Sequence, residues 1–258
     1  MKDMAPSSFF DPTTSPRTSP AAAEVVAALE ASADAERAVG MAAYMRDQFE
    51  FFGIAATPRK EAVKEIIAKR SLDWDFVFAL WAHPKRECQY AAVDHLRRQK
   101  LTIADLGQLQ ELVETKSWWD TVDHLAKCAG TALVPGSRGR GKEPNSLNDA
   151  SSARALMLEW AEAANMWTRR IAILCQLSFG EKTDTQLLRE VIESNLGADT
   201  AYSAEFFITK AIGWALRDFA RHDPQWVLDF VDEHHPDSAL PLKKTLQKGS
   251  FKVLVTDS

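Results

Sequence analysis

The sequence predicts an all-α fold, an α-α superhelix of HEAT-like helical repeats. Three observations support this prediction. Apolar residues recur at helical spacing along most of the chain, helix start signals are frequent, and alternating strand patterns and Asn-Gly or Asp-Gly turns are absent. Helices joined by short connections are typical of stacked helical hairpins, which curve and place one helix of each pair on a concave face.

The predicted helices follow one another along the chain. Pro58 stands at a helix start, where a proline fits the first turn. Thr102 with Asp105, and Ser117 with Asp120, have the spacing of capping boxes. The predicted ranges are 21–31, 34–52, 58–70, 73–81, 84–99, 102–114, 117–132, 153–164, 167–179, 184–194, 204–222, 224–234 and 238–247.

The helices are predicted to form one repeat domain over residues 21–248, between a disordered N-terminal tail (1–20) and a C-terminal tail (249–258). A faint internal repeat supports this organisation. The tetrapeptide VDHL at 93–96 recurs at 122–125, 29 residues later. Residues 135–152, rich in glycine, serine and asparagine, are predicted to be a loop. Its cations, Arg138, Arg140 and Lys142, indicate either solvated charge or an extra phosphate contact.

Composition bounds the class of protein. The 258 residues carry a net charge of -5, which argues mildly against nucleic acid as a partner, although only the local field at a contact surface matters. No apolar run is long enough to span a membrane, and the N-terminus lacks the apolar core of a secretory signal. We therefore expect a cytoplasmic protein.

The three cysteines, Cys88, Cys128 and Cys175, are far apart, and no cysteine or histidine cluster has the spacing of metal ligands. We expect reduced, partly buried thiols and no metal or cofactor. The lack of a four-cysteine set also excludes an iron–sulfur cluster.

The helix predicted at 117–132 carries the first candidate site. Trp118, Val122 and Leu125 form an apolar stripe, whereas Trp119 and Asp123 share an adjacent face. An indole beside a carboxylate is a poor core pair but a useful arrangement for a binding or catalytic site. The alternative is that Asp123 forms a salt bridge or a cap while Trp119 packs at an edge.

The helix predicted at 204–222 has two stripes. The first, formed by Ile208, Ile212, Ala215 and Phe219, is predicted to be buried. The second interleaves cations with one tryptophan, a pattern that suits a phosphate backbone but also occurs on a solvated face. Its members are Lys210, Trp214, Arg217 and Arg221. In the helix predicted at 167–179, Arg169 and Arg170 read by themselves as solvated surface charges.

Three segments resemble signatures of the DNA alkylation repair enzyme family, the AlkD-like glycosylases. They are TKSWWDTVD at 115–123, WTRRIAILCQL at 167–177 and FFITKAIGWALR at 206–217. A weaker match covers residues 41–45 and 52–54, and the resemblance in order and spacing extends over about residues 35–247. The loop at 135–152 departs from the family pattern, which has more helical connections there.

This resemblance implies a HEAT-like superhelix with a concave DNA-binding groove. It implies a DNA glycosylase that excises N3- and N7-alkylated purines, such as 3-methyladenine and 7-methylguanine, while the lesion stays stacked, without a base-flipping pocket. Trp119, Asp123 and Trp214 match the family's catalytic positions. Arg170 matches an arginine that contacts the DNA backbone. Tyr44, Lys210 and Arg217 match positions on the family's DNA-facing surface.

The expected partner is duplex DNA containing alkylated purines, bound by a monomer. Two alternatives stay open at this point. One is a non-catalytic HEAT-like DNA-binding protein, against which the joint presence of Trp119, Asp123, Arg170 and Trp214 argues. The other is a protein scaffold, which the acidic net charge favours but whose concave face would carry apolar anchors rather than cations.

Overall fold

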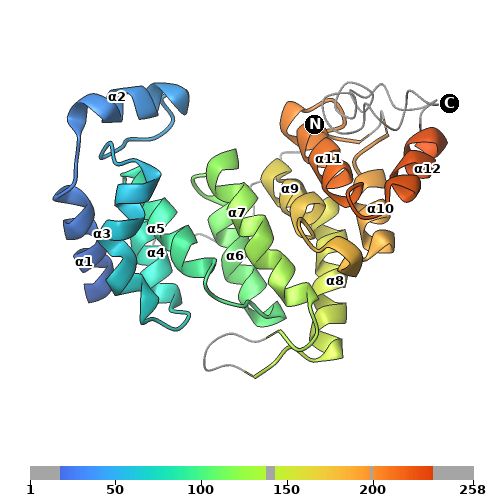
Figure 1. The fold of residues 1–258 in the computed structure, drawn as a ribbon, viewed down its shortest axis with the longest axis horizontal. Helices are drawn as coiled ribbons and strands as arrows, with labels where there is room; N and C mark the ends of the chain where they lie inside the picture. The colour runs from blue at the N-terminus through green and yellow to red at the C-terminus, as the bar shows by residue number, and fades with distance from the viewer. Residues whose placement is uncertain (1–17, 138–142, 198–199, 235–258) are drawn as a thin grey trace, which may run out of the picture. The chain divides into compact units, whose positions relative to one another are not determined.

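The computed structural model describes residues 18–137, 143–197 and 200–234. Within these ranges the chain is helical, apart from one isolated β-bridge between Glu50 and Lys85 (Figure 1), so the predicted all-α class is confirmed. The helices are α1 Pro20–Glu30, α2 Ala35–Tyr44, α3 Ala56–Ala68, α4 Trp74–Ala82, α5 Arg86–Leu96, α6 Leu106–Glu114, α7 Trp119–Gly130, α8 Leu147–Ala161, α9 Met166–Leu174, α10 Thr185–Glu193, α11 Phe206–Phe219 and α12 Pro224–His234. Short 3-10 segments cover Ile103–Asp105, Thr131–Leu133 and Gly180–Lys182.

Several predicted segments lie outside the described residues. These are positions 1–17 of the N-terminal tail, the three loop cations Arg138, Arg140 and Lys142, the helix predicted at 238–247 and the tail at 249–258. No helix among the residues that are described is long and apolar enough to cross a membrane.

The chain divides into two compact units, an N-terminal unit that ends at His95 and a C-terminal unit that begins at Leu96. In the N-terminal unit, α1 packs against α3 and α4. In the C-terminal unit, α9 packs against both α7 and α11, while α8 packs against α9 and α10. The helices α7, α9 and α11 therefore pack side by side in a row. Each comes from a successive helical hairpin, as expected for a helical repeat.

Apolar stripes explain which faces are buried. In α11 the predicted stripe is confirmed, since Ile208, Ile212, Ala215 and Phe219 are all buried. At the other end of the row, α7 and α9 approach closely at Gly130. A Cβ added to Gly130 would lie 2.0 Å from the carbonyl oxygen of Cys175, so only glycine fits this contact.

The predicted helix at 34–52 is wrong beyond Tyr44. The backbone turns at Arg46 and Asp47, which both have positive φ, and residues 48–55 are not helical. The buried carboxylate of Glu87 then accepts hydrogen bonds from the amides of residues 52, 53 and 54 at 2.8–3.1 Å. A buried polar partner from another helix thus replaces the helical hydrogen bonds of this segment.

The predicted capping boxes had different outcomes. Thr102 and Asp105 form one, but Ser117 and Asp120 do not. Ser117 donates its hydroxyl proton to the Val113 carbonyl oxygen at 2.6 Å, and α7 begins after Trp118 without a side-chain cap. Because Ser117 bonds back to the preceding helix, its hydroxyl does not cap α7.

The predicted loop at 135–152 is too long at its C-terminal end. Ser146 and Asp149 form a capping box that starts α8 at Leu147, six residues earlier than predicted. Asn145 is buried and donates to carbonyl oxygens of residues 101, 131 and 132, which anchors the loop where it enters the helix. The polar residues that suggested a loop are in part the cap and first turn of a helix.

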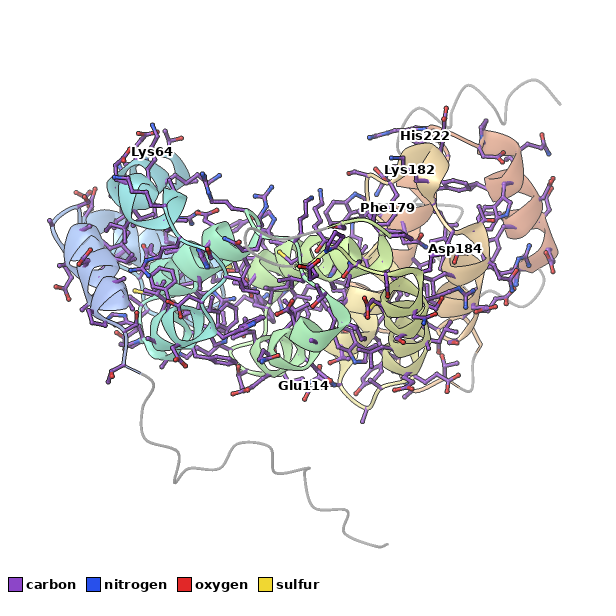
Figure 2. The ribbon with its side chains drawn as sticks, turned by 90° about the horizontal axis from the view of Figure 1, so that it is seen from below. Lys64, Glu114, Phe179, Lys182, Asp184 and His222 are labelled. Atoms are coloured by element: carbon purple, nitrogen blue, oxygen red, sulfur yellow. The ribbon has the colours of Figure 1, made fainter. Side chains whose placement is uncertain are left out.

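An ion pair joins α8 to the start of α10. Asp184 caps α10 by accepting the Leu187 amide at 2.9 Å, and Arg154 donates to the same carboxylate at 2.9 Å (Asp184 is labelled in Figure 2). Burial opposes ionisation of Asp184, but the Leu187 amide and the Arg154 guanidinium outweigh it and lower the pKa of this carboxyl from its ordinary value.

Candidate functional site

The N-terminal half of α7 presents Trp119 and Asp123 on one face, one turn apart. Both side chains are partly exposed, whereas the neighbouring Val122 and Leu125 are completely buried. The predicted core face is therefore confirmed for Val122 and Leu125, whereas Trp118, the third predicted member, precedes the helix and is partly exposed. The Asp123 side chain keeps 14% of its surface exposed, so a molecule on this face could reach the carboxylate.

Asp123 is paired with Arg170 of α9. The Nε and Nη2 atoms of Arg170 donate to the two carboxylate oxygens at 2.7 and 2.9 Å, which is bidentate geometry. The Nη1 atom of Arg170 donates to the backbone carbonyl oxygen of Phe207 in α11. One guanidinium therefore links α7, α9 and α11, the three helices that carry the three sequence signatures.

This ion pair confirms the alternative in which Asp123 forms a salt bridge. The interpretation of Arg169 and Arg170 as solvated surface charges is wrong. Both arginines are buried. Arg169 donates to the carbonyl oxygens of Ala163 and Glu162 and to Asn195. A salt bridge does not remove Asp123 from consideration, since each carboxylate oxygen can accept more than one hydrogen bond.

An aromatic cluster packs at the N-terminal ends of the same three helices. Trp118, Trp167 and Phe207 each contact the other two, with ring centroids 4.9–5.7 Å apart. The Arg170 guanidinium carbon lies 6.0 Å from the Phe207 ring centroid. The aromatic cluster therefore lies beside the ion pair of Asp123 and Arg170. The Thr168 hydroxyl of α9 also donates a hydrogen bond to the Glu114 carboxylate of α6 at 2.9 Å (Glu114 is labelled in Figure 2).

The VDHL repeat supplies a second ion pair in the N-terminal unit, held by one hydrogen bond instead of two. Asp94, which occupies the position of Asp123 in the repeat, pairs with Arg59 at 2.8 Å. The side-chain exposures are similar, 17% for Asp94 and 10% for Arg59, against 14% for Asp123 and 6% for Arg170. This second pair is a natural internal control for any role assigned to Asp123.

The second stripe of α11 is more exposed than the first. Lys210 and Arg221 are exposed, while Trp214 and Arg217 are partly exposed. Arg221 forms a long ion pair with Asp218, at 3.8 Å. Trp214 lies two turns beyond Phe207 on α11, so the two residues share a face of this helix. Phe207 is also the residue whose carbonyl oxygen accepts the hydrogen bond from Arg170.

The predicted site residues thus fall into two groups. Asp123 of α7 and Arg170 of α9 are in direct contact. In the same C-terminal unit, Trp119 lies on α7, and α11 carries Lys210, Trp214 and Arg217. Tyr44 belongs to the N-terminal unit, at the end of α2, where 72% of its surface is exposed. Its predicted role stays a prediction, as do those of the others.

Sequence reasoning missed the role of Phe207 and the joint packing of Trp118 and Trp167. The available signal was an aromatic residue near the start of each of the three signatures. Helical periodicity assigned Trp118 only to an apolar stripe. The contact between Trp118 and Trp167 depends on the stacking of α7, α9 and α11, which no spacing within one helix reports.

Comparison with known proteins agrees with this all-helical fold and with the three linked signatures. The family model of the DNA alkylation repair enzymes matches residues 25–245. The chain therefore belongs to the DNA alkylation repair enzyme family, which gives it a role in DNA repair and DNA as its substrate.

A solved structure is also similar, a predicted DNA alkylation repair enzyme from Enterococcus faecalis. It shares 29% sequence identity with a TM-score of 0.68, over 85% of this chain and 97% of that chain. A search of curated proteins finds no match.

Proposed function

We propose that this protein is a DNA glycosylase that hydrolyses the N-glycosidic bond of cationic N3- and N7-alkylated purines in duplex DNA, 3-methyladenine and 7-methylguanine among them. The observation that carries the proposal is Asp123, a carboxylate fixed by two hydrogen bonds from Arg170 while 14% of its side chain stays exposed. Family membership supports the DNA substrate, and the lesion type comes from the resemblance of the signatures.

The chemistry requires little from the protein. A purine alkylated at N3 or N7 already carries a positive charge, so it is a good leaving group without protonation. What the enzyme must stabilise is the oxocarbenium-like sugar in the transition state, and a fixed carboxylate does this electrostatically. In our proposal Asp123 supplies that carboxylate and orients the attacking water, while the indoles of Trp119 and Trp214 face the cationic sugar and base.

We assign Arg170 a positioning role rather than the backbone contact that the family resemblance implies. Its Nε, Nη1 and Nη2 atoms all donate to protein acceptors, and the residue is only 5% exposed. The guanidinium holds the Asp123 carboxylate in one orientation through two hydrogen bonds.

We place DNA contacts on the cationic stripe of α11. Lys210 and Arg217 would meet phosphates, and Tyr44 of the N-terminal unit would add a further contact, in a complex of one protein molecule with one duplex. The protein would act in the cytoplasm, on chromosomal DNA. Excision of a base that stays stacked would limit the enzyme to lesions with an intrinsically labile glycosidic bond. Because no closed base pocket is needed, the enzyme would also tolerate bulky adducts.

Two alternatives predict different outcomes when base release and binding of the same duplex are both measured. Purified protein is incubated with methylated duplex DNA, and released 3-methyladenine and 7-methylguanine are measured by mass spectrometry. We expect release by the wild type and by Asp94→Asn, and loss of release in Asp123→Asn. A wild type that binds duplex DNA but releases no base would be a non-catalytic DNA-binding protein. One that does neither would be a scaffold.

A further inference from the structure

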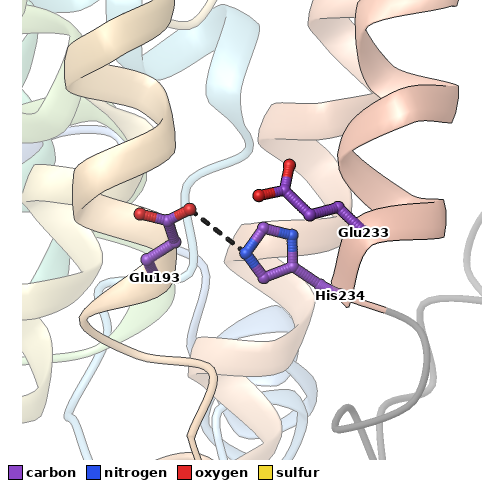
Figure 3. Close-up of side chains that lie close together, drawn as sticks. All are labelled: Glu193, Glu233 and His234. Atoms are coloured by element: carbon purple, nitrogen blue, oxygen red, sulfur yellow. Dashed lines mark hydrogen bonds and ion pairs between the residues drawn. The ribbon is translucent and has the colours of Figure 1, made fainter.

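A group of potential metal ligands lies where α10 ends beside the end of α12, away from the signatures of the proposed active site. It consists of Glu193, Glu233 and His234, which we call the α10–α12 cluster (Figure 3). One ligand atom from each residue, two carboxylate oxygens and one imidazole nitrogen, lies within 4.8 Å of the others. No sequence spacing signals this group, because Glu193 is 40 residues away from Glu233.

His234 is already oriented as a ligand. Its Nδ1 atom is 2.7 Å from the carbonyl oxygen of Phe230, and its ring stacks on the Phe230 ring with centroids 4.3 Å apart. A carbonyl oxygen only accepts, so Nδ1 carries the proton of this hydrogen bond. Metal-binding histidines are usually held in this way, with the second ring nitrogen directed at the ion.

The other ring nitrogen faces an acceptor. Nε2 of His234 lies 3.1 Å from Oε1 of Glu193, drawn as the dashed line in Figure 3. A neutral imidazole whose Nδ1 is protonated presents a lone pair at Nε2, which would repel the lone pairs of the carboxylate. Nε2 of His234 and Oε1 of Glu193 are therefore close enough to bind the same cation.

Arg189 supports the two carboxylates without using all their oxygens. Its Nη1 atom donates to Oε1 of Glu193 at 3.1 Å and to Oε2 of Glu233 at 2.9 Å. Among the described residues, the second oxygen of each carboxylate has no hydrogen bond or ion pair. Metal-binding carboxylates are themselves commonly hydrogen-bonded, so Arg189 fits the role of a support as well as that of a competing charge.

We propose that the α10–α12 cluster binds one divalent transition-metal ion of the zinc type, through Nε2 of His234 and one oxygen each of Glu193 and Glu233. Imidazole and carboxylate together are a common zinc donor set, with bond lengths of about 2.0–2.2 Å. Tetrahedral ligands at that distance are about 3.4 Å apart. The ligand atoms lie up to 4.8 Å apart, so the side chains must close by up to about 1.4 Å. Glu233, whose side chain is 58% exposed, is free to do so.

The test uses the full-length protein, freed of metal by chelation, and zinc sulfate as the probe. Calorimetric titration reports stoichiometry and affinity, and thermal unfolding reports stabilisation. We expect one zinc ion per chain and, at a hundredfold excess over Kd, a rise in Tm of about 5–10 °C that chelation reverses. The three cysteines are buried, which keeps them from competing for zinc in the folded protein.

Two variants and one control decide the outcome. His234→Gln and Glu233→Gln should each weaken zinc binding at least tenfold, whereas His222→Gln, which changes an exposed histidine outside the cluster, should not. If His234→Gln does not fold, Glu233→Gln still tests the metal site, because Glu233 is exposed and its substitution should not disturb the fold. Wild-type protein without stoichiometric zinc binding, or cluster variants that bind as tightly as the wild type, would overturn the proposal. A Tm that responds to pH but not to zinc would also overturn it, since a proton would then bridge His234 and Glu193.

Discussion

Replacing Asp123 with asparagine separates its structural role from its proposed catalytic role. Asparagine has the same shape, but it carries no charge and has one acceptor oxygen instead of two. The Arg170 guanidinium, with a side chain only 6% exposed, would lose its counterion. Breaking a buried ion pair by changing one partner costs about 3–5 kcal/mol. Because Asp123 is 14% exposed and asparagine retains one hydrogen bond, we expect the lower limit, about 3 kcal/mol.

That loss is measurable. For a domain of this size, 1 kcal/mol shifts Tm by about 2–4 °C, so Asp123→Asn should lower Tm by about 6–12 °C. Asp94→Asn, at the equivalent position of the repeat, should cause a similar or somewhat smaller loss, because its ion pair with Arg59 has similar burial but one hydrogen bond instead of two. Circular dichroism during heating measures both shifts, and urea unfolding provides the free energies.

Excision should distinguish the two variants, although their stabilities are similar. Removing one preorganised electrostatic group from an active site lowers kcat by about 100- to 1,000-fold. We expect that loss for Asp123→Asn in single-turnover excision of 7-methylguanine, measured at 25 °C, and little change for Asp94→Asn. Equal rates for the two variants would refute the reasoning, since Asp123 would then be no more than a structural salt bridge.

Three further predictions concern other parts of the molecule. Lys210→Ala and Arg217→Ala should each reduce the salt dependence of DNA affinity by about one unit of slope, if each contacts one phosphate, and unchanged slopes would remove α11 from the DNA interface. Burial raises the pKa of Cys128 and of Cys175 to about 12, so a thiol reagent should label neither at pH 8 until the protein is unfolded. The pKa of Asp184 is lowered in the folded state, so its stabilisation is complete above the ordinary carboxyl pKa and is lost as pH falls through the folded value. Asp184→Asn should therefore flatten the acid side of the stability curve measured by urea unfolding, and a curve parallel to that of the wild type would contradict this assignment.

Local sequence determined much of the secondary structure. The range predicted for α12, 224–234, agrees with the structure, and the buried stripe of α11 follows directly from the spacing of Ile208, Ile212, Ala215 and Phe219. Such features depend on contacts within one helix and on which of its faces is apolar, and the local sequence determines both.

The errors arose where a residue outside the predicted helix decides the local structure. The helix predicted at 34–52 ends at Tyr44, and the amides that follow it are bound by the buried carboxylate of Glu87. Ser117 has the spacing of a cap, but its hydroxyl bonds to the preceding helix instead. In both places the competing partner is supplied by another part of the chain, and periodicity does not report it.

The candidate site shows the same division. Sequence by itself selected Asp123, Trp119, Trp214 and Arg170, through three signatures and the sharing of helix faces. Only the tertiary structure decided that Arg170 binds Asp123 rather than solvent, and that Phe207 accepts its remaining contact. Spacing along a helix fixes which side chains share a face, but the partner of a buried charge depends on how separate helices pack.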